Sequence, residues 1–513
     1  MTDPAFDVAV VGFGPAGATL ANLLGKAGVR TLVIDKSRDV YDMPRAFAID
    51  HEIMRVFQNI GIAEAVAPHT SPFTASEYYG ANGQLIKRLG SIAPPYPLGW
   101  APNMVFTQPP VEAALRAHAA RWPSVTIELG TELKGLAQSS DRATLDLVRD
   151  DGNKRSVDAR YAVGCDGAWS TVRTLSDLSY LDLQFDEPWL VVDLKVSEHG
   201  LAKLPDVSIQ YCDPQRPATY LIGPGNHRRW EIMVLPGEDR REMEKDEHVW
   251  RLLSPWLSPA DAALWRCASY QFHALVAEQW RKGRVLIAGD AAHQQPPFTG
   301  QGMCQGVRDV TNLAWKLVRV LRGSSAGALL DTYTLERREH VKRLTTVIKG
   351  IGRLICERDP VAASARDERL LAEAGGKVKT QPRQDLIPPL VEGLLSPVAH
   401  RANGTIFPQP RVEHGGKPVL LDDMTGTGFR IVTNDARLAG VPRPADVALI
   451  VIDDAPRSNG ALHVRETEGV VAAWFERFGC KAAIVRPDHY VYGVADDATQ
   501  LASRLSALSA AIA

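Results

Sequence analysis

The stretch Phe6-Asp-Val-Ala-Val-Val-Gly12-Phe-Gly14-Pro15-Ala16-Gly17 decides the fold. Its first half is an apolar run typical of a buried strand, and the alanine- and leucine-rich segment that follows has the composition of a helix ending near Gly28. The glycines permit a tight turn and let the backbone approach a pyrophosphate at the start of that helix. The stretch therefore predicts a Rossmann-type α/β unit.

A second apolar strand, Arg30-Thr-Leu-Val-Ile-Asp35, completes the dinucleotide fingerprint because it ends in a carboxylate. Asp35 can accept a hydrogen bond from a ribose 2′-hydroxyl, and its charge disfavours a 2′-phosphate, so NADPH is not expected here. Lys36, the next residue, is counted with the predicted cofactor-binding residues. The fingerprint alone fits either FAD or NAD, and a tight strand–helix turn of an unrelated α/β fold is the alternative interpretation.

The composition is that of an ordinary globular protein. The chain has 513 residues, of which 45% are hydrophobic and 23% charged, enough for several domains. A formal net charge of -2 gives no reason to expect nucleic acid or an anionic membrane as a partner. The 6 cysteines have no spacing suited to a metal, so no metal site is expected, and no spanning apolar run or signal peptide is evident. These features predict a soluble, cytoplasmic protein with reduced thiols.

A third informative stretch lies past the middle of the chain: Gly283-Arg-Val-Leu-Ile-Ala-Gly289-Asp290-Ala-Ala-His293-Gln-Gln-Pro-Pro297-Phe-Thr-Gly300-Gln-Gly302-Met303-Cys304. It has the pattern of a short strand that ends in Gly-Asp, followed by a loop of prolines and glycines that opens into a helix. A carboxylate beside outward-pointing helix amides can hold a polyol and an electron-rich ring together. The stretch predicts a binding site for the ribitol chain and the ring of a flavin.

Two further sites could contact a cofactor. Alternating segments between residues 124 and 163 predict strands, and they lead into Cys165-Asp166-Gly167-Ala-Trp-Ser170-Thr-Val-Arg173. Arg45 could pair with a phosphate and Gln108 could hydrogen-bond a cofactor. For the Asp166 segment, a glycine-stabilised turn before a capped helix is the alternative; for Arg45 and Gln108 it is a surface salt bridge or a helix cap.

In this order and spacing, the three motifs resemble those of the class A flavoprotein aromatic hydroxylases, which are single-component FAD-dependent monooxygenases that consume NAD(P)H. The segment Arg229–Gly237 and the Pro-Arg-Ala and Gln-Pro-Pro segments are most similar to the 3-(3-hydroxyphenyl)propionate hydroxylase branch. The resemblance covers residues 1 to about 350. It implies the α/β fold of p-hydroxybenzoate hydroxylase, in which a β-sheet substrate domain is inserted into a Rossmann-type FAD-binding domain.

Four parts are expected on this basis, the last resembling a thioredoxin-like domain. That part lacks a Cys-x-x-Cys pair, and Cys480 stands alone, so we expect a structural role or an oligomer surface, compatible with a homodimer. The expected parts are a discontinuous FAD-binding domain (1–75, 101–180 and 279–355), a substrate-binding β-sheet domain (76–100 and 181–278), a helical connector (356–403) and the thioredoxin-like C-terminal domain (404–513).

The resemblance implies tightly bound, non-covalent FAD and transient NADH or NADPH, because no second complete fingerprint is present. Asp35 would bind the adenosine ribose, Asp290 the ribitol or pyrophosphate, and the amides near Met303 the anionic reduced ring. Pro297 would form a rigid wall beside the reacting carbon. The predicted cofactor-binding residues are Gly12, Gly14, Pro15, Ala16, Gly17, Asp35, Lys36, Arg45, Gln108, Asp166, Gly289, Asp290, Pro297, Gly300, Gly302, Met303 and Cys304.

The implied reaction is hydroxylation of a phenol, ortho to its hydroxyl, by a flavin C4a-hydroperoxide formed from O2. Deprotonating the phenol needs a base with a pKa near neutrality. The candidates are His51, His227 and His273, with Tyr220, Tyr211 or Tyr270 in a relay. None has a motif behind it, and taken alone each is more typical of a packed or surface residue. A substrate carboxylate could pair with Arg216 or Arg229 and contact Tyr211.

The leading substrate is a phenolic acid such as 3-(3-hydroxyphenyl)propionate, and polyketide-type phenols and hydroxypyridines are alternatives. Other classes with a similar fingerprint are FAD oxidases or dehydrogenases, flavin halogenases and the GDP-dissociation inhibitors, which bind a protein instead of flavin. The Trp-x-Trp-x-Ile-Pro element of the halogenases is absent from the sequence. Flavin content and oxygen use would separate the remaining classes.

Overall fold

Strand β1 (Phe6–Val11) lies inside an eight-stranded sheet whose main order is β17-β18-β11-β1-β2-β8 in the computed structural model, which describes residues 4–453 and 460–513. It pairs in parallel with β2 (Thr31–Asp35) and β11 (Lys154–Gly164). The other strands of this order are β8 (Val125–Leu129), β17 (Arg281–Lys282) and β18 (Val285–Ile287). Helix α1 (Pro15–Lys26) follows β1 directly. The glycine turn therefore lies at the carboxyl ends of parallel strands, where open α/β sheets bind ligands.

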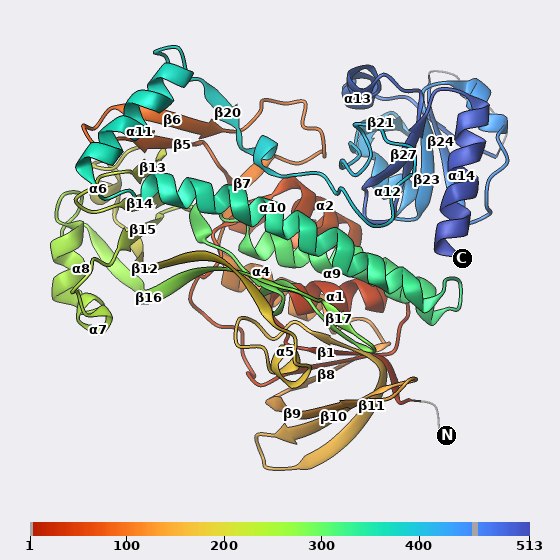
Figure 1. Cartoon of the computed structure of the whole chain (residues 1–513), viewed down its shortest axis with the longest axis horizontal. Helices are drawn as coiled ribbons and strands as arrows, with labels where there is room; N and C mark the ends of the chain where they lie inside the picture. Colours follow the sequence, from red (N-terminus) through yellow and green to blue (C-terminus); the bar gives the residue numbers. More distant parts are fainter. Residues whose placement is uncertain (1–3, 454–459) are drawn as a thin grey trace.

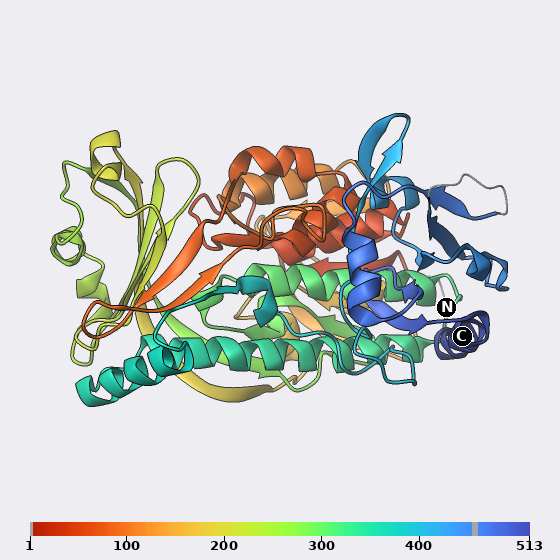
Figure 2. The ribbon, with the colours of Figure 1, turned by 90° about the horizontal axis from the view of Figure 1, so that it is seen from above.

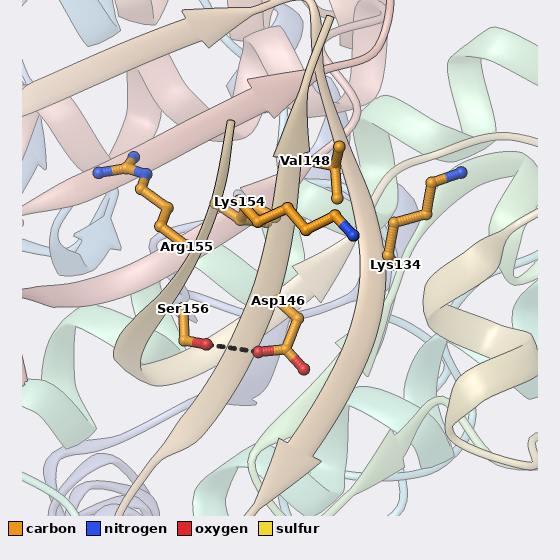
Figure 3. A pocket seen from close by; sticks show the side chains of 7 residues that line it. Lys134, Asp146, Val148, Lys154, Arg155 and Ser156 are labelled. Carbon is orange, nitrogen blue, oxygen red and sulfur yellow. Dashed lines mark hydrogen bonds between the residues drawn. The ribbon is translucent and has the colours of Figure 1, made fainter. Parts of the chain in front are cut away.

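An antiparallel extension widens this sheet. β9 (Thr131–Gln138) and β10 (Ala143–Arg149) pair with each other, and β10 pairs with β11. A hollow of about 650 Å³ lies over these strands, where Ser156 donates a hydrogen bond of 2.5 Å to Asp146 beside the side chains of Lys134 and Lys154 (Figure 3). None of the predicted site residues lines it.

A second sheet has nine strands in the order β19-β16-β12-β15-β14-β13-β5-β6-β20 and lies at the opposite end of the molecule from the C-terminal domain (Figures 1 and 2). Its longest strands, β12 (Tyr180–Val196) and β16 (Ala262–Ala277), pair with each other. The other strands are β5 (Ala75–Tyr79), β6 (Leu85–Gly90), β13 (Ser208–Tyr211), β14 (Ala218–Ile222), β15 (His227–Met233), β19 (His293–Gln294) and β20 (Thr380–Pro382).

Two long helices run side by side along the long axis of the molecule (Figures 1 and 2). They are α9 (Gly302–Leu321) and α10 (Asp331–Ile355). The connector predicted to be helical contains α11 (Pro360–Glu373), but it also supplies β20 and a short 3-10 helix, Arg383–Leu386. The connector is therefore part of the second sheet. No helix in residues 4–453 and 460–513 is long and apolar enough to cross a membrane.

The C-terminal part has its own five-stranded sheet, ordered β25-β24-β23-β26-β27. β23 pairs in parallel with β24 and antiparallel with β26. The likeness to thioredoxin stays a prediction. The elements are β23 (Phe429–Thr433), β24 (Val447–Ile452), β25 (Leu462–Val464), β26 (Ala482–Val485), β27 (Val491–Ala495), α13 (Val470–Phe478) and α14 (Ala498–Ile512).

Buried ion pairs join the C-terminal part to the remainder of the protein. Arg486 contacts Glu336 of α10 at 2.6 Å, and Arg55 of α2 (His51–Ile60) contacts Asp422 at 2.6 Å. Although burial alone would raise it, Arg486 and Lys316 hold the pKa of Glu336 at about 2. The C-terminal part is thus fixed against α9, α10 and α2 by fully desolvated charges.

Candidate active site

A single cavity of about 710 Å³ extends from the glycine turn to the nine-stranded sheet. Nearly all predicted cofactor-binding residues line it. Gly17 does not line it, because it packs against the turn itself: a Cβ added at Gly17 would lie 2.0 Å from the carbonyl oxygen of Gly12. Cys304 does not line it either, because it is buried in the core. The predicted residues that do line the cavity are Gly12, Gly14, Pro15, Ala16, Asp35, Lys36, Arg45, Gln108, Asp166, Gly289, Asp290, Pro297, Gly300, Gly302 and Met303.

The N-terminus of α1 opens into this cavity. Its N-cap, Gly14, provides no side chain to cap the helix, and a Cβ added at Gly14 would meet nothing within 4 Å. Gly12 has a φ of +98°, and a Cβ there would lie 2.4 Å from the carbonyl oxygen of Cys165. Gly12 is thus required for the turn, whereas Gly14 leaves space in front of a helix terminus suited to an anion.

The carboxylate of Asp35 is held at the cavity wall. One oxygen accepts a hydrogen bond from the Phe13 amide at 2.7 Å, and the other accepts one from the Ser37 amide at 2.7 Å. Gln108 accepts from the Ala46 amide at 2.6 Å and donates to Glu112 at 3.1 Å. Asp35 is therefore held in place by two amides at the cavity wall, while Gln108 also fixes the loop that carries Arg45.

Three carboxylates organise the opposite wall. Asp166 accepts hydrogen bonds from the Ser170 hydroxyl at 2.5 Å and the Val172 amide at 3.0 Å, and burial raises its pKa. The carboxylate of Asp290 is exposed on the cavity wall, yet the surrounding protein raises its pKa by desolvation. Buried Asp309 accepts hydrogen bonds from the Gly289 amide at 2.9 Å and contacts His293 at 2.7 Å. Together with Asp309, His293 thus stabilises the loop that begins at Gly289, and it does not line the cavity.

A second helix terminus opens into the cavity at α9. Its N-cap, Gln301, makes no side-chain capping bond, and Gly302 and Met303 line the cavity. The helix begins at Gly302, which places both residues in its first turn. Two uncapped helix N-termini in one cavity would stabilise two anionic groups of one ligand.

Past Pro297 the cavity continues beneath the nine-stranded sheet. Leu221 of β14, Glu231 of β15 and Phe272 of β16 all line this part of the cavity. Aromatic side chains form much of this chamber, which suits a flat ring and excludes water. They are Phe47, Phe73, Tyr78, Phe272 and Phe298.

The charged residues of this chamber differ in how they are paired. Arg229 contacts Asp193 at 2.7 Å and donates to the backbone oxygens of Pro44 and Arg45, both at 2.9 Å. The guanidinium of Arg383 donates to the Thr299 carbonyl and lies over the Phe73 ring, with no ion pair to a carboxylate among the described residues. Arg383 is therefore available to an anionic ligand, and Arg229 is not.

Comparisons with known proteins agree with this architecture. Residues 5–347 match the family described as FAD binding domain, and residues 404–511 match the HcaD C-terminal domain family. A probable NADH-specific resorcinol 4-hydroxylase of Rhodococcus jostii is 36% identical, with 99% of this chain and 96% of that protein covered. A 3-(3-hydroxy-phenyl)propionate/3-hydroxycinnamic acid hydroxylase of Mycolicibacterium smegmatis is 35% identical, with coverages of 98% and 92%.

The chain belongs to the FAD-dependent aromatic hydroxylases. This confirms the family resemblance, the FAD cofactor and the predicted class of enzyme. The hydroxylase also shares its fold with aklavinone-11 hydroxylase, solved with FAD and aklavinone, at a TM-score of 0.80, 22% identity, and coverages of 99% and 100%. At that identity the likeness supports the fold alone.

The cavity of the hydroxylase fits FAD by its own chemistry. The open terminus at Gly14 suits the pyrophosphate, Asp35 the adenosine ribose, and the α9 terminus an electron-rich ring. These assignments of single residues stay predictions. In residues 4–453 and 460–513, no group of three or more His, Cys, Asp or Glu side chains could hold a metal ion.

The structure places most predicted catalytic residues away from the cavity. His227 is fully buried, with Nε2 2.7 Å from Asp193, and burial lowers its pKa. Burial also lowers the pKa of His51 to about 4, and His51 does not line the cavity. The hydroxyl of buried Tyr220 donates to the Pro205 carbonyl at 3.1 Å. Their geometry argues against a base role, and of the three histidines only His273 lines the cavity, 3.3 Å from Asp186.

The predicted substrate residues are likewise mostly engaged elsewhere. Arg216 pairs with Glu238 at 2.5 Å and Tyr211 accepts a hydrogen bond from Trp256 at 3.1 Å, and neither lines the cavity. Sequence reasoning missed Glu231 and Arg383, which do line it. The alternating pattern of β15 could have indicated that Glu231 faces the same way as Arg229.

Proposed function

We propose that this hydroxylase adds a hydroxyl group ortho to the existing hydroxyl of a small phenolic acid, with 3-(3-hydroxyphenyl)propionate as the leading substrate. The observation that carries the proposal is the aromatic chamber, which holds both the carboxylate of Glu231 and the cationic Arg383. Relatives that match along the whole chain are named for small phenols, which favours these over polyketide-type substrates. The proposed co-substrates are O2 and NADH or NADPH.

FAD, once reduced by NADH or NADPH, would supply the activation of oxygen. The chain's own residues would bind and orient: Asp35 and the α1 terminus at one end of the cofactor, and Asp290 and the α9 terminus nearer the chamber. The aromatic wall would exclude water, which keeps the activated oxygen for the substrate. Pro297 would limit the positions open to the substrate ring.

A panel of phenols tests this function. The purified enzyme is given NADH or NADPH with 3-(3-hydroxyphenyl)propionate, 3-hydroxycinnamate, resorcinol or a hydroxypyridine. The phenolic acids should accelerate NAD(P)H oxidation most and yield a product heavier by one oxygen atom. A resorcinol preference would favour the second candidate, a neutral dihydric phenol, which the Rhodococcus relative supports. NAD(P)H oxidation with hydrogen peroxide as the sole product for every phenol would contradict the proposal.

Replacing Arg383 with Gln should separate acidic from neutral substrates. Loss of a charge-assisted hydrogen bond of about 1.5–3 kcal/mol should raise KM for the phenolic acid by roughly 10- to 100-fold. KM for resorcinol should change little, because resorcinol carries no carboxylate. Arg88→Gln is the matched control. Arg88 lies on β6 outside the cavity and pairs with Glu77 at 3.1 Å. Equal effects on both substrates would exclude Arg383 as a carboxylate anchor.

A further inference from the structure

Glu231 lines the chamber from within the nine-stranded sheet. It lies on β15 between two paired strands, opposite Thr219 of β14 and Val191 of β12. All three residues line the cavity, and the side chain of Glu231 is 5% exposed. Glu231 is therefore a nearly buried carboxylate whose remaining exposure is to the cavity.

The carboxylate of Glu231 has no hydrogen bond from any described residue of the chain. The nearest cation, Nη1 of Arg229, is 4.0 Å away, and the hydrogen bonds of Arg229 go to Asp193 and to the backbone of Pro44 and Arg45. A buried carboxylate without a donor is unfavourable unless it is protonated or a ligand donates to it. The chamber thus has an acceptor that is open to an O–H group.

The charged groups of the sheet around Glu231 come from three strands. Arg229 of β15 and Arg266 of β16 are cationic, and Asp193 of β12 balances them at 2.7 and 3.5 Å. His227 is bound to Asp193, the hydroxyl of Tyr270 accepts from Arg266, and Gln210 of β13 and Thr219 of β14 are neutral. Arg383 lines the same cavity. Burial raises the pKa of Glu231 to about 7, with the arginines opposing this and Asp193 adding to it.

We propose that Glu231 is the catalytic base that accepts the proton of the substrate's phenolic hydroxyl, an assignment that rests on the proposed function. The phenolic O–H bond breaks, its proton moves to the carboxylate, and its electron pair flows into the ring. The ortho carbon then forms a bond to one oxygen atom of O2 while the O–O bond breaks, and the other oxygen atom leaves as water with the two electrons that NAD(P)H supplies. The proton on that carbon leaves as the ring regains aromaticity. Overall, phenol, O2, NAD(P)H and a proton give the dihydric product, NAD(P)⁺ and water.

Other residues of the chamber suit this role less well. His273 lies 3.3 Å from Asp186 and is 37% exposed, which leaves it open to solvent. The hydroxyl of Tyr270 is engaged by Arg266. Glu231, in contrast, is nearly buried, lines the chamber and has an acceptor that no described residue occupies.

Glu231→Gln tests the assignment, because it keeps the shape of the side chain and removes the base. In the wild-type enzyme, kcat/KM for the phenol should rise as the pH increases through about 7, since the ionised carboxylate is the active form. The variant should lose that rise and hydroxylate about 100-fold or more slowly. Its FAD content and melting temperature should stay unchanged.

Phenol binding gives a readout that does not depend on turnover. The affinity of the oxidised enzyme for the phenol, measured from the change in flavin absorbance, should increase through the same pH range in the wild type and be independent of pH in Glu231→Gln. Glu77→Gln is the matched control, because Glu77 lies on the same sheet outside the cavity. It should retain both pH dependences.

The outcomes separate the two proposals. Wild-type hydroxylation that Glu231→Gln leaves unchanged, with the same pH profile, would overturn the role of Glu231 alone. A wild-type enzyme that hydroxylates no phenol would overturn the proposed function and this role together. If the Gln variant does not fold, Glu231→Asp decides: a large loss of rate with FAD retained supports the role, and a wild-type rate overturns it.

Discussion

Gly14→Val enzyme should fold normally but bind FAD about 100-fold more weakly, a loss equal to one or two charge-assisted hydrogen bonds of about 1.5–3 kcal/mol each. A Cβ at Gly14 meets nothing within 4 Å, and the backbone there (φ -69°, ψ -174°) is allowed for valine. The valine side chain would instead occupy the space in front of α1 that the pyrophosphate needs. The cost to the helix N-cap is about 1 kcal/mol.

Flavin fluorescence titration of the apoprotein measures this affinity, and thermal unfolding of the apoprotein checks the fold. Gly350→Val is the matched control: Gly350 lies exposed on α10, a Cβ there also meets nothing within 4 Å, and the cavity is elsewhere. The control should bind FAD like the wild type. Native FAD affinity in Gly14→Val would show that the pyrophosphate does not lie against this turn.

Arg486→Met should destabilise the protein by about 3–5 kcal/mol, the usual consequence of leaving a buried charge without its partner. The guanidinium of Arg486 donates to Glu336, Asp488 and the Leu394 carbonyl at 2.6 to 3.1 Å. Without it, buried Asp488 loses its cation and Glu336 keeps only Lys316, at 2.8 Å, in the interface between α10 and the C-terminal part. We expect this part to detach first and become sensitive to proteases.

Denaturant unfolding combined with limited proteolysis measures the effect. Arg437→Met is the control, because Arg437 pairs with Asp435 on the surface of the same C-terminal part and its side chain is 81% exposed. That pair should contribute no more than about 1 kcal/mol. Similar losses in the two variants would argue against a specific role for the buried network.

Much of the fold could be predicted because its elements carry local signals. Helix α2, for example, has a local start signal, because its N-cap Asp50 accepts hydrogen bonds from the amides of Glu52 and Ile53. Strand β16 was not predicted, because its polar and apolar residues mix where one face borders the cavity. The strand β20 lies in a segment with few apolar residues, and only its pairing with β6 gives it a regular structure.

In the candidate site, too, the residues with local sequence signals could be predicted and the residues placed by packing could not. The residues predicted to bind FAD come from contiguous motifs, in which glycine spacing and strand ends fix the backbone whatever surrounds it. The substrate residues are isolated charges and aromatics whose environment is set by packing. His227 was selected by residue type, but its partner Asp193 lies on a neighbouring strand. Glu231 and Arg383 stand out only when the cavity is known.

Hydroxylation of 3-(3-hydroxyphenyl)propionate under isotopically labelled O2 tests the central claim most directly. The purified enzyme, FAD and NAD(P)H are mixed with the phenol, and the product is analysed by mass spectrometry. We predict a dihydric phenol that carries one labelled oxygen atom, in an amount that matches the NAD(P)H consumed. An unlabelled product, or hydrogen peroxide in place of product with every phenol tested, would contradict the account.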